Sequence, residues 1–403
     1  MPIYVIGTLD TKGPELAWVR DRIVDADLSA IMVDAGCVGE PNFAPDVSAH
    51  QVFAAAGSSL EEVRAKNDRG NAVTLAAAGV TQIVGDAAKA GTVDGIIALG
   101  GSAGTTIGTS AMRDLPLHIP KVMVSTMASG QTRPYVGGRN ILMMNAVADI
   151  AGINRISRIV LGQAVSAIVG MVRNSALLQQ QNDDRPIIAA TMFGVTTPCV
   201  THARKILESA GYEVVVFHAT GNGGESMEGL IRDGVISGVL DITTTELADE
   251  LVGGVLSAGP DRLTAAADAG IPQVISVGAL DMVNFGARDT VPEKFSDRTF
   301  YEHNANVTLM RTTMDESQAL GEEIGSKASA ATGPVSVLFP SLGVSAIDVE
   351  GQPFDNGAAR MALWHGLQST CKENVDLSLH QNTINDPMFA EIAATKLLDL
   401  MER

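Results

Sequence analysis

Short apolar runs alternate with longer amphipathic segments along the first half of the chain. Runs rich in Val and Ile recur at 3–6, 30–33, 95–99, 122–124 and 141–144. Helical patterns lie between or after them, at 15–26, 60–89 and 155–180, and Pro14 suits a first helical position. Continuous apolar strands that alternate with helices are typical of a parallel sheet covered on both faces.

The same alternation restarts after the polar segment QQQNDDRP at 179–186. We interpret this segment as a boundary between an N-terminal domain, residues 1–181, and a C-terminal domain, residues 182–403. Strand patterns then follow at 187–192, 213–217, 235–240, 273–277, 335–339 and 375–379. Helical patterns follow at 198–210, 261–269, 315–330 and 387–403. The predicted fold class is α/β, with two wound, mostly parallel-sheet (Rossmann-like) domains and the ligand cleft at the carboxyl ends of the strands.

One stretch, 278–308, shows no regular pattern and is too long for an ordinary connection. We expect it to be a functional loop or an excursion that binds a partner. The length of 403 residues agrees with two or three domains of about 150 residues each.

Charge narrows the choice of partners. Residues 1–181 hold 14 Lys and Arg against 15 Asp and Glu, whereas residues 182–403 hold 14 against 31. An acidic body without a basic cluster repels nucleic acid and anionic membranes, so neither is expected as a partner. An anionic ligand suits the nearly neutral N-terminal half better.

Three further features bound the class of protein. The cysteines Cys37, Cys199 and Cys371 are far apart, which indicates neither a disulfide framework nor a zinc site. No uninterrupted apolar stretch approaches the ~20 residues of a membrane span. The first residues lack the basic segment of a signal peptide, so we expect a cytoplasmic protein.

The loops that follow the N-terminal strands carry the candidate chemistry. The first strand leads into GTLDTKGPE at 7–15, the third into GGSAGTT at 100–106, and the fourth into STMASG at 125–130. Glycines let a backbone approach a phosphate closely, and the following helix directs its positive end at the anion. No loop matches a Walker A or GxGxxG motif, and a single Gly-rich loop is as often a plain turn. Three such loops in one domain favour phosphate or nucleotide binding.

Individual residues can be assigned to this predicted site. The backbone and hydroxyl groups would bind phosphate, Lys12 would add a point charge, and Asp10 or Glu15 would hold magnesium. Asp34, at the end of the second strand, would accept ribose hydroxyls, or else cap the Asp-Ala-Gly turn. Arg133 would reach the phosphates, or else form a surface or interface ion pair. The candidate ligand-binding residues are Thr11, Lys12, Gly13, Asp34, Gly100, Gly101, Ser102, Gly104, Thr105, Thr126, Ser129 and Gly130.

The combination of GTLDTKG, DAG at 34–36, GGSAGT, STMASG, GVTTP at 194–198 and HATGNGG at 218–224 is specific. It resembles the bacterial relatives of the tomato mosaic virus resistance protein, a family with a Tm-one-like ATP-binding domain. The resemblance covers the whole chain. It implies two α/β subdomains, ATP as the ligand of the N-terminal one, and a homodimer, but it implies no particular reaction.

The strand ends of the second half carry a further polar set. His218, Asp241 and His380 each come immediately after a predicted strand, and we expect them to form a second, catalytic site. A His with a nearby carboxylate can act as a general acid or base near neutral pH. The alternative is that these residues serve as caps and turns. Ser341 in FPSLG lacks the GxSxG pattern of a nucleophile, and His303 is a lone His in the irregular stretch.

Three functions agree with these observations. The leading hypothesis is an ATP-binding protein, an ATP-dependent transferase or ligase, that holds Mg-ATP in the N-terminal domain and acts on a small metabolite. The second is a non-catalytic, dimeric ATP-binding module that recognises a protein. The third is an enzyme that acts on a small organic acid through the C-terminal loops without ATP turnover.

Overall fold

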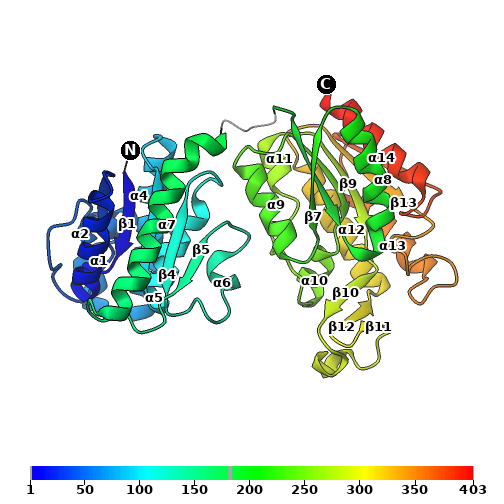
Figure 1. The fold of residues 1–403 in the computed structure, drawn as a ribbon. Helices are drawn as coiled ribbons and strands as arrows, with labels where there is room; N and C mark the ends of the chain where they lie inside the picture. Colours follow the sequence, from blue (N-terminus) through cyan, green and yellow to red (C-terminus); the bar gives the residue numbers. More distant parts are fainter. Residues whose placement is uncertain (1, 180–183, 403) are drawn as a thin grey trace. The chain divides into compact units, whose positions relative to one another are not determined.

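A computed structural model describes residues 2–179 and 184–402. Its internal contacts divide the chain into two units, Met1–Asp183 (unit 1) and Asp184–Arg403 (unit 2). Each unit is a wound parallel sheet with helices on both faces (Figure 1), which confirms the predicted α/β fold class. The predicted boundary at 181/182 lies outside the described residues.

The sheet of unit 1 has five parallel strands in the order β2-β1-β3-β4-β5. Its strands are β1 (Ile3–Gly7), β2 (Ala30–Asp34), β3 (Gly95–Gly100), β4 (Lys121–Ser125) and β5 (Leu142–Asn145). Its helices are α1 (Leu9–Val24), α2 (Ala49–Ala55), α3 (Leu60–Lys66), α4 (Arg69–Lys89), α5 (Ser102–Asp114), α6 (Arg133–Val136) and α7 (Arg155–Gln179). One apolar core joins the sheet to α2, α3, α4 and α5, and a second core joins the other face to α1 and α7.

The predicted helix over 60–89 is interrupted, which the pattern did not reveal. Asn67 ends α3 with a left-handed backbone (φ +47°), and the Asp68 carboxylate accepts the Asn71 N–H (3.1 Å) to cap α4. Asn tolerates the left-handed region better than other non-glycine residues, and Asp is a strong N-cap. The chain therefore turns at 67–68, and this corner lies beside the ends of the strands.

Helix α7 contains a 21-residue stretch, Arg155–Ser175, that is long and apolar enough to cross a membrane by length and composition. In unit 1 it packs on the sheet, and Leu161, Ala164, Val165 and Ile168 are buried in the core with β1, β3 and β4. The apolar face of α7 is thus explained by packing in a globular unit. The cytoplasmic location stays a prediction.

The sheet of unit 2 has six parallel strands in the order β14-β13-β9-β8-β6-β7. Its strands are β6 (Ile187–Met192), β7 (Glu213–His218), β8 (Gly238–Thr243), β9 (Gln273–Gly278), β13 (Val335–Pro340) and β14 (Val375–His380). Its helices are α8 (Thr197–Ser209), α9 (Asn222–Arg232), α10 (Glu246–Val252), α11 (Ala265–Ala269), α12 (Met314–Ser329), α13 (Gly357–Thr370) and α14 (Pro387–Met401), with a 3-10 turn η1 (Gly194–Thr196).

The stretch 278–308 is more regular than its sequence indicated. It holds most of a three-stranded antiparallel sheet in the order β10-β12-β11, which extends from unit 2 (Figure 1). The elements are β10 (Met282–Phe285), η2 (Arg288–Thr290), η3 (Glu293–Phe295), β11 (Phe300–Asn304) and β12 (Val307–Arg311). Strand β10 is buried on both faces, so the alternation that marks a half-exposed strand is missing from it.

Candidate functional site

An open pocket of about 770 Å³ lies in unit 1 where β1 and β3 end. In a wound sheet the ligand crevice lies outside the carboxyl ends of the strands, where the strand order reverses. In the order β2-β1-β3-β4-β5 that reversal falls between β1 and β3. The pocket walls come from the turn after β1, the start of α5, the loop after β2 and the α3–α4 corner. The topology and the pocket therefore indicate the same position.

The start of α5 forms one wall of this pocket. Gly100, Gly101, Ser102 and Gly104 line it, and within residues 2–179 and 184–402 no side chain caps the helix N-terminus. The first N–H groups of a helix have no partner within the helix, and the helix dipole is positive there. A Cβ on Gly100 would lie 2.8 Å from the Gly104 Cα, so this turn requires glycine. The result is a compact backbone donor surface that suits an anion.

The turn after β1 supplies hydroxyl and charged side chains. Helix α1 is kinked at Lys12 (φ −127°, ψ 18°), so Thr8, Asp10, Thr11 and Lys12 all line the pocket. The Lys12 ammonium donates to the Ile150 carbonyl in the loop after β5. The Asp10 carboxylate accepts the N–H groups of Val38 (2.8 Å) and Gly39 (3.0 Å).

Other predicted residues are engaged inside the protein. The Asp34 carboxylate accepts the N–H groups of Leu9 and Gly36, both at 2.9 Å, and burial raises its pKa. These contacts match the turn-cap alternative for Asp34. Glu15 is buried and accepts the Gly152 N–H, and it does not line the pocket. The Thr105 hydroxyl is buried against the Ser125 hydroxyl at 2.6 Å.

The remaining residues of the predicted set are not part of the pocket lining. Gly13 is packed under Asn42, whose Oδ1 would lie 2.2 Å from an added Cβ. Thr126 is half-buried behind Gly101, and its N–H donates to the Gly100 carbonyl (3.3 Å). Ser129 and Gly130 are exposed in the loop after β4, and Arg133 begins α6. These residues do not line the pocket.

The structure adds residues that the sequence did not single out. The α3–α4 corner contributes Arg64, Asn67 and Arg69 to the pocket, and the loop after β5 contributes Asp149. Below them Val63, Ala72, Val73, Ala76 and Ile107 form an apolar surface. The signal that could have found the corner is local, because Asn67-Asp68 is a helix stop followed by a helix N-cap.

In unit 2 the three predicted catalytic residues are not brought together. His218 ends β7 and His380 ends β14, and these are the two edge strands of the six-stranded sheet. Five spacings of about 4.8 Å separate such strands, roughly 24 Å in all. The His218 ring is exposed and packs on Phe193, whereas the His380 Nε2 lies 2.9 Å from the Ser378 hydroxyl, and burial lowers the pKa of His380.

Asp241 belongs to a buried ionic network. Its carboxylate receives both terminal nitrogens of Arg262 at 2.6 and 2.7 Å, and it accepts the Thr191 hydroxyl at 2.7 Å. Arg262 also pairs with Glu246 (2.7 Å) and Glu228 (3.3 Å), and its side chain is completely buried. Both carboxylate oxygens of Asp241 are engaged in these internal contacts, which favours the structural alternative over proton transfer with His218.

Two lone candidates have ordinary surroundings. The Ser341 hydroxyl donates to the His380 carbonyl at 2.9 Å, which is a turn contact. His303 is exposed on β11. Within residues 2–179 and 184–402, no three His, Cys, Asp or Glu side chains form a group that would hold a metal ion by themselves.

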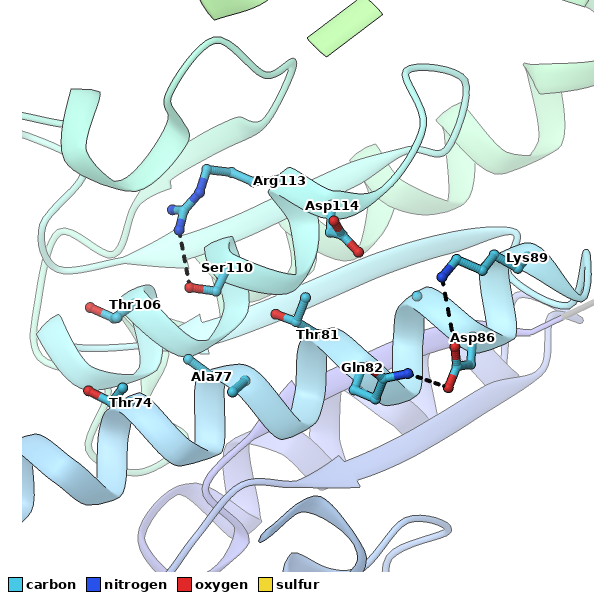
Figure 2. A pocket seen from close by; sticks show the side chains of 12 residues that line it. Thr74, Ala77, Thr81, Gln82, Asp86, Lys89, Thr106, Ser110, Arg113 and Asp114 are labelled. Atoms are coloured by element: carbon cyan, nitrogen blue, oxygen red, sulfur yellow. Dashed lines mark hydrogen bonds and ion pairs between the residues drawn. The ribbon is translucent and has the colours of Figure 1, made fainter. Parts of the chain in front are cut away.

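A second hollow lies between the outer faces of α4 and α5 (Figure 2), with a volume of about 670 Å³. Five of its polar side chains pair with one another along α4 or along α5. Gln82 donates to Asp86 (2.7 Å), Lys89 lies 4.0 Å from Asp86, and Arg113 donates to Ser110 (3.2 Å). The groove runs along the helices and away from the strand ends, so we place the candidate site at the β1/β3 pocket.

The fold and the site together define a two-unit wound α/β protein with an open pocket at the switch point of unit 1. The chain belongs to the UPF0261 family. The N-terminal domain described as "Uncharacterised protein family (UPF0261)" matches residues 1–177, and the C-terminal domain of the same family matches residues 185–401.

Relatives extend over the whole chain. A UPF0261 protein of Clostridium tetani is 50% identical over 100% of this chain and 99% of its own length. The ToMV resistance protein Tm-1(GCR237) of Solanum lycopersicum is 37% identical over 99% of this chain and 55% of its own length, which confirms the resemblance inferred from the motifs. A putative UDP-N-acetylglucosamine 2-epimerase from Listeria monocytogenes is 10% identical over 68% of this chain and 78% of that one, with a TM-score of 0.24. At that score the likeness carries no argument about function.

Proposed function

We propose that unit 1 binds ATP in the pocket between β1 and β3. The observation that carries the proposal is the uncapped N-terminus of α5, whose glycine turn faces a pocket at the switch point of the sheet. The donor surface suits the phosphates, and the apolar surface of Val63, Val73 and Ile107 suits the base. The family resemblance narrows the nucleotide to ATP.

The carboxylates that line the same pocket are the candidate ligands of the expected magnesium ion. Mg²⁺ takes one or two carboxylates together with phosphate oxygens and water. Asp10 and Asp149 line the pocket, whereas Glu15 does not, and Asp68 caps α4. Asp10 with Asp149 is therefore the pair we propose for the ion. The homodimer and the metabolite remain predictions of the sequence.

A charge placed at the start of α5 tests the proposal. Ser102 is exposed, lines the pocket and lies in the first turn of the helix. In Ser102→Glu the added carboxylate stabilises the helix N-terminus and repels phosphate, so binding should weaken at least 100-fold without loss of stability. The measurement is titration calorimetry with ATP, with and without Mg²⁺.

The matched control is Ser110→Glu, which makes the same change on α5 but in the groove of Figure 2. It should bind ATP as the wild type does. ADP release, followed in the same samples, separates an enzyme that spends ATP from a module that only binds it. Absence of wild-type binding at millimolar ATP would overturn the proposal.

A further inference from the structure

The three cationic side chains of the β1/β3 pocket differ in their surroundings. Lys12 donates to the Ile150 carbonyl. Arg64 donates to the carbonyls of Cys37 (3.0 Å) and Gly39 (2.7 Å) and pairs with Glu40 (3.2 Å). The Arg69 side chain is exposed at the pocket wall and forms no hydrogen bond or ion pair with the described part of the chain. Arg69 is thus the cation that is open to a ligand.

The position of Arg69 is costly for its own helix. Arg69 is the first residue of the 21-residue helix α4, and no acidic residue follows in the first turn. A helix N-terminus carries a partial positive charge, so a cation there is disfavoured by some tenths of a kcal/mol or more. The Asp68 carboxylate, the nearest counter-charge in sequence, accepts the Asn71 N–H instead. A residue that breaks a local rule without an internal gain indicates a functional role.

The pocket shows what that role is. Arg69 and the glycine turn of α5 line the same cavity, and Ala72, Val73 and Ala76 of helix α4 contribute apolar lining to it. An arginine fork matches a phosphate group with two parallel hydrogen bonds. We infer that Arg69 binds the phosphate chain of the nucleotide and gives the pocket its preference for the more highly charged ligand. This inference rests on the proposed function and extends it to specificity.

The experiment compares Arg69→Ala with Arg69→Lys and with the matched control Lys66→Ala. Lys66 is an exposed cation three residues away that does not line the pocket. Affinities for ATP, ADP and adenosine are measured by calorimetry, with ligand-observed NMR for the weak adenosine complex. A lost charge-assisted contact corresponds to about a 10- to 100-fold change in Kd.

We expect Arg69→Ala to weaken ATP binding by that factor and ADP binding by less. The Kd for adenosine should stay within about twofold of the wild-type value. Arg69→Lys should recover part of the loss, because it keeps the charge without the fork. Lys66→Ala should match the wild type. The ligand-free Arg69→Ala protein should melt at the same temperature as the wild type or higher, because the unfavourable charge at the start of α4 is gone.

The outcomes separate this inference from the proposed function. If the wild type binds no ATP, the proposed function fails, and this inference fails with it. If the wild type binds ATP and Arg69→Ala binds it equally well, the inference alone is wrong. If Arg69→Ala weakens the binding of ATP and adenosine by the same factor, Arg69 shapes the pocket and does not contact the phosphates. That result also contradicts the inference.

Discussion

Arg262 shows how much of the polar character of unit 2 is structural. The guanidinium is completely buried and faces Asp241, Glu246 and Glu228. The Glu246 carboxylate also accepts the N–H groups of Gly221 (2.7 Å) and Gly224 (3.0 Å) at the start of α9. Nearby carboxylates hold the pKa of Arg262 above its usual range despite burial. The network ties β8, α9 and α10 to the segment before α11.

Removal of this cation should destabilise unit 2. In Arg262→Met three buried carboxylates lose their partner, and breaking a buried ion pair typically costs about 3–5 kcal/mol. Trp364 on α13 reports on unit 2, so urea unfolding is followed by fluorescence in a Trp18→Phe background. Arg232→Met is the control, because the Arg232 side chain is 46% exposed and its pair with Glu228 spans 3.8 Å. A control that lost as much stability as Arg262→Met would contradict this account.

Asp249 makes the stability of unit 2 depend on pH. Burial raises its pKa from 3.8 to about 7, and hydrogen bonds from Asn284 and Leu256 only partly oppose the rise. Between these two pKa values the folded state keeps a proton that the unfolded state has lost. This stabilisation is complete below about pH 4 and is lost as the pH rises toward 7. Burial of Asp281 raises its pKa to about 7 as well and acts in the same direction.

The test compares unfolding midpoints at pH 5 and pH 8. The wild-type midpoint for unit 2 should be lower at pH 8, and the difference should shrink in Asp249→Asn, which cannot ionise. The substituted amide can donate to the Asn284 Oδ1, a buried atom that has no hydrogen-bond partner in the described part of the chain, once the Asn284 amide turns over. Asp289→Asn, an exposed change on η2, should keep the wild-type pH dependence. An unchanged pH dependence in Asp249→Asn would rule out this assignment.

At the scale of elements, the strands were the most predictable feature. Strands buried on both faces appear in the sequence as continuous apolar runs rich in Val and Ile, as in β1, β3 and β13. The α3–α4 corner was missed because the helical pattern continues on both sides of Asn67 and outweighs the local stop and N-cap signal of Asn67-Asp68. The corner matters because it supplies Arg69 to the pocket.

Part of the lining of the candidate pocket was predicted, whereas the internal contacts of the predicted carboxylates were not, for a physical reason. The glycine turn at 100–104 carries its chemistry in the local sequence, so it was recognised. The engagement of Asp34 with Leu9, 25 residues away, and of Glu15 with Gly152, 137 residues away, depends on long-range packing. A sequence shows which carboxylates are available, but not which of them the fold uses internally.

At the scale of the whole molecule, the two units share one winding order. The spatial strand order β7-β6-β8-β9 in unit 2 matches the order β2-β1-β3-β4 in unit 1. Each unit therefore has a switch point, at β1/β3 in unit 1 and at β6/β8 in unit 2. The helices that follow these points differ. Helix α5 begins without an acidic residue, whereas α10 begins with Glu246 and Asp249, both buried. In unit 2 the chain's own carboxylates occupy the first turn, which favours unit 1 as the place of the proposed anion site.

Hydrogen–deuterium exchange of the full chain, with and without Mg-ATP, tests most directly the proposal that the nucleotide binds to unit 1. The account predicts that ATP slows exchange at the start of α5, in the turn after β1 and at the α3–α4 corner, while the β6/β8 region of unit 2 exchanges as before. Protection centred on the strand ends of unit 2, or no protection at saturating ATP, would contradict the assignment of the ligand to unit 1.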